Sequence, residues 1–395
     1  MSLSPPAMTT LWGNLLKRPV AADRVDLLLA LPMLALALFG WVMVTSASVD
    51  IDATNLGDAW YHSKRHGLWL LIGTGVLLLT RRVPLAWWER HGARLLLVAI
   101  VLLVLVLVPG IGRKVNGSAR WLGFGSVSVQ TSEIAKAFIL IYLSGYLVRH
   151  RVEVQQRWTG FFNPMLILGL VIALLILEPD YGAVVVLMST VLGLFFLAGM
   201  AVLRFSTLIL GSIALGSLLL VAQPYRLERI KAYIDPWADQ YGSGYQLVQA
   251  LIAFGRGEWF GLGLGNSVQK VFYLPEAHTD FVFAVIAEEL GLLGCLALVA
   301  LFVMLIWRGL VIARNAECEG RLFGGYLAYG ITLMLAIQVL INLGVNTGLL
   351  PTKGLTLPLI SYGGSSIVVT GFMLALLLRV EAESGLPIRS EEESP

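Results

Sequence analysis

The sequence predicts an all-α polytopic integral membrane protein with ten transmembrane helices. Of its 395 residues, 57% are apolar and only 13% are charged, and the mean hydropathy is +0.80. Soluble domains are roughly half apolar and about a quarter charged. The apolar residues also gather into long segments, several of which approach or reach the about 20 residues that a helix needs to cross a bilayer. Both observations exclude a soluble globular enzyme.

Ten apolar segments account for the predicted number of helices. They lie at residues 25–45, 67–80, 94–109, 132–148, 162–178, 182–199, 205–222, 281–307, 323–345 and 362–379. An even number of crossings places both termini on one side of the membrane. The first segment follows basic residues as a signal peptide would, but its length is typical of a retained helix rather than of a cleaved core.

The short loops indicate which side is cytoplasmic. Basic residues precede the first segment and flank the even-numbered connections: Lys17, Arg18, Arg24, Arg81, Arg82, Arg90, Arg94, Arg149, Arg151, Arg157, Arg308, Arg314 and Arg321. Cytoplasmic loops carry such an excess of Lys and Arg. We therefore expect cytoplasmic tails at residues 1–22 and 381–395, a membrane core at 23–380, and a long extracytoplasmic loop at 222–280 between the seventh and eighth helices.

Charge and cysteine content exclude two classes of function. The net charge of +3 is too small to indicate a nucleic-acid partner. Cys295 lies in an apolar segment and Cys318 in a basic loop. The sequence therefore predicts neither a disulfide framework nor a thiolate metal site.

The most unusual stretch is YLPEAHTDFVFAVIAEELG, residues 273–291. It places Glu276, His278 and Asp280 within five residues, directly before an apolar run. Carboxylates at the mouth of a membrane segment are costly and usually functional. Spacing alone leaves two interpretations of Asp280 open, a chemical role or the N-cap of the following helix. His278 is either a second base or a loop histidine bonded to the backbone.

Two more carboxylates, Glu288 and Glu289, follow in the same stretch. On one regular helix running from Asp280 they would lie about 80° and about 180° round the axis from it. They cannot both face one cavity, so we expect them to form hydrogen bonds between helices or to face a partner.

Further polar motifs lie on the same predicted outer face. In order they are NGSARWLGFG at 116–125, QTSEIAK at 130–136, EPDYG at 178–182, GLGLGNS at 261–267 and PTKGLTLPLISYGGSS at 351–366. Glu133 and Lys136 share a helical face, as a local ion pair would. The 261–265 glycines lack the context of a nucleotide site and favour close approach of the backbone to a helix or a ligand.

These motifs, with DPWADQYGSGYQ at 235–246 and LPEAHTDF at 274–281, resemble in order those of the SEDS family (shape, elongation, division and sporulation). The resemblance covers residues 23–380, and the 351–366 segment is similar to the cell-division branch rather than the elongation branch. Thr131 departs from the pattern, since the family usually has proline there. The resemblance implies ten transmembrane helices with cytoplasmic termini.

The resemblance also implies a function. It is the polymerisation of lipid II, the undecaprenyl-diphosphate-linked disaccharide pentapeptide, by a peptidoglycan glycosyltransferase of the inner membrane at the division septum. Implied partners are a class B penicillin-binding transpeptidase and other division proteins. A divalent cation, Mg or Mn, is a possible cofactor.

The same resemblance assigns roles to residues. It implies that Asp280 is the catalytic base, which we expect to be ionised because a cation lies near it. Glu133 and Lys136 would hold or pair with Asp280, and Arg120, Lys353 or a divalent cation would neutralise the diphosphate. The remaining expected site residues are Trp121, Glu276, His278, Ser361, Tyr362 and Gly363.

Two other functions fit a protein of this kind. A lipid II flippase needs a polar path that reaches both membrane faces, whereas the unusual residues here gather on one face, which favours an enzyme. A noncatalytic division scaffold would tolerate the substitution Asp280→Asn in cells.

Overall fold

The computed structural model of the chain describes residues 26–115, 118–124, 127–221, 232–271 and 273–384. Within these residues, seven helices are long and apolar enough to cross a membrane. They are α2 (Leu27–Asn55), α4 (Leu85–Leu107), α5 (Thr131–Arg149), α7 (Thr159–Leu177), α12 (Val282–Cys318), α13 (Leu322–Asn346) and α14 (Gly364–Ser384). The protein is therefore a polytopic helical membrane protein, as the composition predicted.

Three more helices coincide with the remaining predicted spans. They are α3 (Tyr61–Thr80), α8 (Tyr181–Leu197) and α9 (Val202–Val221). The first turns of α3 are polar, with the sequence YHSKRH, and α8 has only 17 residues. Because α3 begins with polar residues and α8 is shorter than a typical span, ten crossings stay a prediction. The predicted tail at 1–22 lies outside the described residues, as does 385–395, and the predicted loop at 222–280 is described from residue 232.

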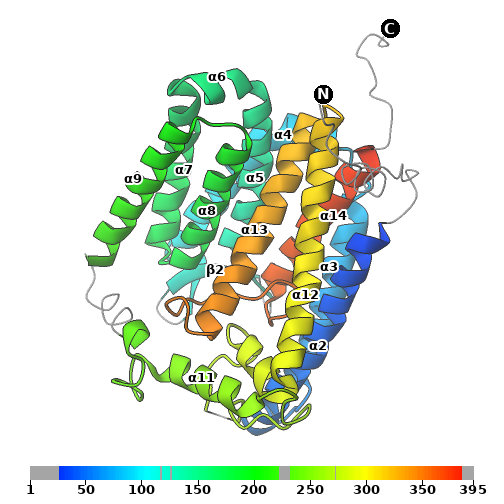
Figure 1. The fold of residues 1–395 in the computed structure, drawn as a ribbon, viewed down its shortest axis with the longest axis vertical. Coiled ribbons are helices and arrows are strands. Elements are labelled where there is room, and N and C mark those ends of the chain that lie inside the picture. Colours follow the sequence, from blue (N-terminus) through cyan, green and yellow to red (C-terminus); the bar gives the residue numbers. More distant parts are fainter. Residues whose placement is uncertain (1–25, 116–117, 125–126, 222–231, 272, 385–395) are drawn as a thin grey trace, which may run out of the picture.

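The helices form one bundle, with α13 at its centre (Figure 1). This helix packs against α5, α8, α12 and α14, and its described side chains are mostly buried. Arg308 of α12 pairs with Asp26 and with Glu381, so α2 begins and α14 ends at the same end of the bundle. The short helix α6 (Arg151–Gln156) also lies at that end, and α11 (Tyr245–Gly257) lies at the opposite one (Figure 1). We call the latter the α11 end.

A small antiparallel sheet between α4 and α5 adds to the predicted all-α architecture. Strands β1 (Gly112–Val115), β2 (Ser118–Phe124) and β3 (Val127–Gln130) pair in the order β1-β2-β3. Trp121 is aligned with Arg113 on one side and with Gln130 on the other. The Asn116-Gly117 dipeptide of this segment is the strongest short-range hairpin signal, so the sequence did carry a sign of the sheet.

Helix α12 is interrupted at Gly291, whose φ of 65° and ψ of −165° are not helical. The segment 257–263 pairs with the backbone there: Leu262 and Gly263 donate to the carbonyls of Glu288 and Glu289, each at 2.9 Å. A Cβ atom on Gly261 would lie 2.2 Å from the Glu289 carbonyl oxygen. The predicted close approach of the glycine segment to a neighbouring helix is therefore confirmed.

Candidate functional site

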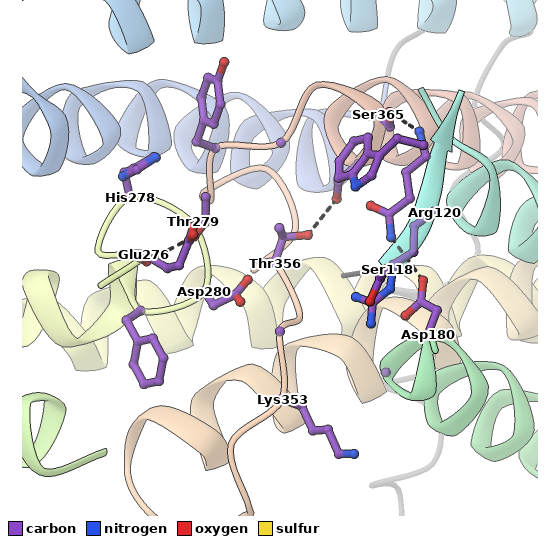
Figure 2. Close-up of a pocket in the computed structure, with 18 of the residues that line it drawn as sticks. Ser118, Arg120, Asp180, Glu276, His278, Thr279, Asp280, Lys353, Thr356 and Ser365 are labelled. Carbon is purple, nitrogen blue, oxygen red and sulfur yellow. Dashed lines mark hydrogen bonds between the residues drawn. The ribbon is translucent and has the colours of Figure 1, made fainter. Parts of the chain in front are cut away.

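A cavity of about 920 Å³ opens among the loops and helix ends at the α11 end. Several segments distant in sequence line it: the start of α3, the sheet, the α7–α8 turn, α11, the loop that precedes α12 and the loop that precedes α14. Of the predicted site residues, it brings together Asp280, Arg120, Trp121, Glu276, His278, Lys353, Tyr362 and Gly363. Figure 2 shows Asp280 between the segment of His278 and that of Thr356, with Arg120 and Asp180 further across.

A tight turn sets the position of Asp280. The Glu276 carbonyl accepts hydrogen bonds from the backbone N–H groups of Thr279 at 3.1 Å and Phe281 at 3.3 Å. Helix α12 begins at Val282 and Phe281 holds its capping position, so the interpretation of Asp280 as an N-cap is wrong. The Asp280 side chain is half-buried and lines the cavity instead.

The surroundings of Asp280 favour its protonated form more than expected. Burial raises the pKa of this carboxyl to about 7; the Glu276 carboxylate also raises it, whereas the Arg120 guanidinium lowers it. With this pKa the carboxyl is about half ionised at pH 7, whereas the resemblance led us to expect the ionised form to predominate. A pKa near the operating pH suits a general base, because such a group is partly ionised and still basic enough to accept a proton.

The Asp280 carboxylate lies against Gly354. A Cβ atom at position 354 would come within 2.9 Å of Asp280 Oδ2. We therefore expect Gly354→Ala to push the carboxylate aside at little cost to folding, because the end of a side chain yields easily. Misplacement of a reacting group by about 1 Å can lower a rate by about 100-fold.

The measurement for Gly354→Ala is the initial rate of the glycosyl transfer that the motif resemblance implies, together with the midpoint of thermal unfolding in detergent. Gly75→Ala is the matched control, since a Cβ atom there meets nothing within 4 Å. A wild-type rate for Gly354→Ala would show that the carboxylate next to Gly354 has no part in the reaction.

His278 contributes its backbone and its ring to the same wall. Its carbonyl accepts a hydrogen bond from the Tyr362 N–H at 2.9 Å, and its ring centroid lies 4.6 Å from that of His62. Burial, and then His62, lower the pKa of His278 to about 4, although Glu276 and Asp52 oppose this. The imidazole is therefore neutral at pH 7. Glu276 is exposed, and its Oε2 accepts a hydrogen bond from the Thr279 hydroxyl at 2.7 Å.

Arg120 and Asp180 lie together in the facing wall. Arg120 donates to the carbonyls of Glu178 and Pro179. Asp180 caps α8 through the Ala183 N–H and accepts a hydrogen bond from the Ser132 hydroxyl at 2.7 Å. Sequence reasoning noted the two carboxylates of EPDYG only as an outer turn and missed Asp180 as a cavity residue. A carboxylate just after a helix-breaking proline was the available signal.

Other lining residues that sequence reasoning missed carry charge, hydrogen-bonding groups or aromatic surface. They include Arg65, Trp69, Gln130, Gln246, Thr356 and Ser365. Lys353, which was predicted, lies 5.5 Å from the centre of the Tyr181 ring. The predicted Ser361 is buried behind the wall, where its hydroxyl accepts a hydrogen bond from the Leu357 N–H at 2.8 Å. It shapes the 351–366 loop rather than lining the cavity.

Glu133 and Lys136 do not contact Asp280, which corrects the prediction that they hold or pair with it. Lys136 Nζ lies 2.8 Å from Glu133 Oε1, and their side chains are 1% and 8% exposed. The two residues are three positions apart on α5, so they satisfy each other inside the bundle, as the local alternative proposed. They lie behind the cavity wall.

Glu288 and Glu289 are fully buried, so the alternative that they face a partner protein is wrong. Glu288 accepts hydrogen bonds from the Ser267 hydroxyl and from the backbone N–H groups of Val268 and Gln269, and Arg256 pairs with it. Glu289 pairs with Lys270. Both carboxylates anchor the loop between α11 and α12.

The described part of the chain contains no group of three His, Cys, Asp or Glu side chains that could hold a metal ion. A divalent cation here would take one or two carboxylates of the cavity and complete its coordination with substrate phosphate and water, as Mg²⁺ commonly does. The carboxylates among the lining residues are Asp180, Glu276 and Asp280.

Comparison with known proteins places the chain among cell cycle proteins. The model of the FtsW, RodA and SpoVE family of cell cycle proteins matches residues 26–385. The chain belongs to this family. The match spans all ten predicted transmembrane segments except the first residue of the first, and it confirms the resemblance stated from the motifs.

Curated relatives lie in the division branch of the family. One protein from Hahella chejuensis is 57% identical over 371 residues, which cover 94% of each chain. Another from Pseudomonas fluorescens is 54% identical over 359 residues, which cover 91% of this chain and 88% of the relative. Both are named "Probable peptidoglycan glycosyltransferase FtsW".

Solved structures share the fold. A chain from a structure titled "Structural coordination of polymerization and crosslinking by a peptidoglycan synthase complex" is 29% identical and superposes with a TM-score of 0.74, covering 92% of this chain and 99% of that one. The rod shape determining protein RodA of Thermus thermophilus is 28% identical and superposes with a TM-score of 0.68. The match covers 91% of this chain and 98% of the RodA chain.

Proposed function

We propose that this protein is a peptidoglycan glycosyltransferase that polymerises lipid II during septal cell-wall synthesis, with Asp280 as its general base. The observation that carries the proposal is the place of the Asp280 carboxyl, in the wall of a polar cavity that also contains Arg120, Arg65 and Lys353. Membership of the family and relatives named as glycosyltransferases support it.

The reaction joins the 4-hydroxyl oxygen of an acceptor sugar to the anomeric carbon of a donor. As this bond forms, the bond from the anomeric carbon to the diphosphate oxygen breaks, and polyprenyl diphosphate leaves with the bonding electrons. Asp280 takes the hydroxyl proton, and attack from the opposite face inverts the anomeric carbon. Glycosidases need a second carboxyl to protonate a poor leaving group. Diphosphate is a good leaving group, so one base suffices here.

The cations of the cavity suit the charge of the leaving diphosphate. Arg120 is fixed by the carbonyls of Glu178 and Pro179, so its guanidinium is held in place before substrate arrives. Such preorganised charge stabilises a developing anion more than mobile water does. A bound Mg²⁺ or Mn²⁺ would add further charge neutralisation at the diphosphate.

We expect the rate of polymerisation to rise with pH through about 7. The base must be unprotonated to accept a proton, and the pKa of Asp280 is raised to about 7. Below that pH the ionised fraction, and therefore the rate, falls about tenfold per pH unit. Initial rates between about pH 5 and pH 9 with saturating lipid II measure this. A profile that stays flat down to pH 5 would show that no group with this pKa limits the reaction.

A flippase is the second function to test. It needs a polar path along the bundle, yet midway along α5 and α13 the buried side chains of Leu140, Met334 and Leu335 are apolar. The experiment combines purified protein, its cognate transpeptidase and fluorescent lipid II, with and without EDTA, and separates the glycan products on a gel. The same protein in vesicles, assayed for transfer of lipid II between leaflets without polymer formation, tests the flippase.

The proposed topology has ten crossings, cytoplasmic termini and an extracytoplasmic α11 end in the inner membrane. The basic short loops support this orientation. The ion pairs of Arg308 with Asp26 and with Glu381 support placing the start of α2 and the end of α14 on the same side of the membrane. We also propose that a class B penicillin-binding transpeptidase associates with this protein. The similarity to a chain from a peptidoglycan synthase complex supports that partner.

A further inference from the structure

Three polar side chains follow one face of α13. Gln338, Asn342 and Asn346 are spaced four residues apart, so they lie above one another on the helix. Their exposed fractions are 2%, 2% and 0%. Uncompensated polar groups in a membrane-spanning helix are costly, and those that occur are usually functional and paired. We call this set the α13 amide ladder.

Two residues of the ladder, Asn342 and Asn346, hold the backbone of Asp280. Asn342 and Asn346 each donate from Nδ2 to the Asp280 carbonyl oxygen at 3.0 Å. Asn346 also accepts a hydrogen bond from the Ala284 N–H at 3.2 Å. Phe281, at the capping position of α12, has no side-chain acceptor. The Ala284 N–H also donates to the Phe281 carbonyl at 3.0 Å, so Asn346 adds a second acceptor, from another helix, where the side chain of an N-cap residue would normally stand.

The ladder also holds the loop that precedes α14 and faces Asp280. Asn342 Nδ2 donates to the Leu355 carbonyl at 2.6 Å, and Gln338 Nε2 donates to the Thr356 carbonyl at 3.2 Å. Gly354 and Thr356 of this loop line the cavity, and Gly354 lies against the Asp280 carboxylate. Asn342 thus joins the backbones of the two opposing wall segments. Their separation depends on its side chain.

We propose that Asn342 and Asn346 are positioning residues that fix Asp280 for proton transfer, an inference that rests on the proposed role of Asp280. The two amides lie behind the cavity wall, bonded to main-chain atoms, so they act on the reaction through the placement of Asp280. Reacting groups tolerate little misplacement, since about 1 Å can cost about 100-fold in rate.

The test compares Asn342→Ala and Asn346→Ala with Asn342→Ser and Asn346→Ser in the reconstituted lipid II polymerisation assay with the cognate transpeptidase. Ala and Ser remove nearly the same volume, but Ser keeps one hydrogen-bond donor. We expect Ala to lower kcat by about 10- to 100-fold with KM for lipid II changed by less than about twofold. The Ser variants are expected to lose less. Leu340→Ala is the control, because Leu340 lies on the same helix and is 65% exposed.

Each outcome decides the inference. A wild-type kcat for both Ala variants overturns it, and so does a raised KM with unchanged kcat, which would indicate a binding role. If the Ala variants fail to fold, as judged by thermal unfolding in detergent, the Ser variants carry the same comparison of kcat with KM. Asp280→Asn, assayed in parallel, separates the two proposals. If Asp280→Asn is inactive while the variants at Asn342 and Asn346 have normal activity, Asp280 remains the proposed base and the positioning role of the α13 amide ladder is wrong. If Asp280→Asn is active, both proposals are wrong.

Discussion

Asp280→Asn is expected to lower the rate of lipid II polymerisation by about 10²- to 10⁴-fold, the usual contribution of a general base. Asparagine keeps the shape of the side chain and its contact with Gly354 but cannot take up the hydroxyl proton. The main-chain bonds of Asn342 and Asn346 to residue 280 do not involve its side chain, so the fold is expected to persist. The measurement is the single-turnover rate of glycan formation by purified protein with its transpeptidase.

Asp58→Asn is the matched control for this substitution. Asp58 is a carboxylate in the loop between α2 and α3, paired at the surface with Lys64 and outside the cavity lining. Its replacement should leave polymerisation unchanged. A rate for Asp280→Asn within about threefold of wild type would remove Asp280 from the chemistry. Normal septation in cells that express only Asp280→Asn would favour the noncatalytic scaffold.

The helices were predictable because a membrane imposes one strong rule. Every backbone polar group in hydrocarbon must be paired inside its own segment, so a sufficiently long apolar segment predicts a transmembrane helix. Helix α13 was predicted at 323–345 and lies at Leu322–Asn346. The ends of a helix are harder to predict where the helix continues through polar residues. Helix α2 runs on to Asn55, beyond the predicted limit at residue 45, because Asp52 is buried and bonded to His62.

The side-chain partners could not be predicted in the same way. Glu133 and Lys136 were expected to reach Asp280, but which face of α5 points to the cavity depends on the rotation of the helix in the bundle. Asp180 entered the site because the sheet and the α7–α8 turn meet there, a contact between segments far apart in sequence. The break of α12 at Gly291 was likewise hidden, because an isolated glycine has several possible causes.

Neutralising one member of the buried pair Lys270–Glu289 is expected to destabilise the fold by about 3–5 kcal/mol. Lys270 Nζ lies 2.8 Å from Glu289 Oε1, and their side chains are 3% and 0% exposed. The Ser46 hydroxyl of α2 lies 2.8 and 2.7 Å from the two carboxylate oxygens of Glu289 and donates its one hydrogen there, and Lys270 donates to the Gly265 carbonyl. Lys270→Met therefore leaves a carboxylate in the core that has lost its counter-ion. The midpoint of thermal unfolding in detergent reports the loss.

The double variant Lys270→Met with Glu289→Leu separates the charge from the packing. Replacing a buried ion pair by apolar groups of similar volume is often nearly neutral, because both desolvation costs disappear together. We therefore expect the double variant to be more stable than either single one, with a large coupling free energy in the mutant cycle. Lys64→Met, in an exposed pair with Asp58, should change nothing measurable. Additive single effects would show that Lys270 and Glu289 do not stabilise each other, and that the 257–270 loop is held on α12 by its backbone bonds to Glu288 and Glu289 instead.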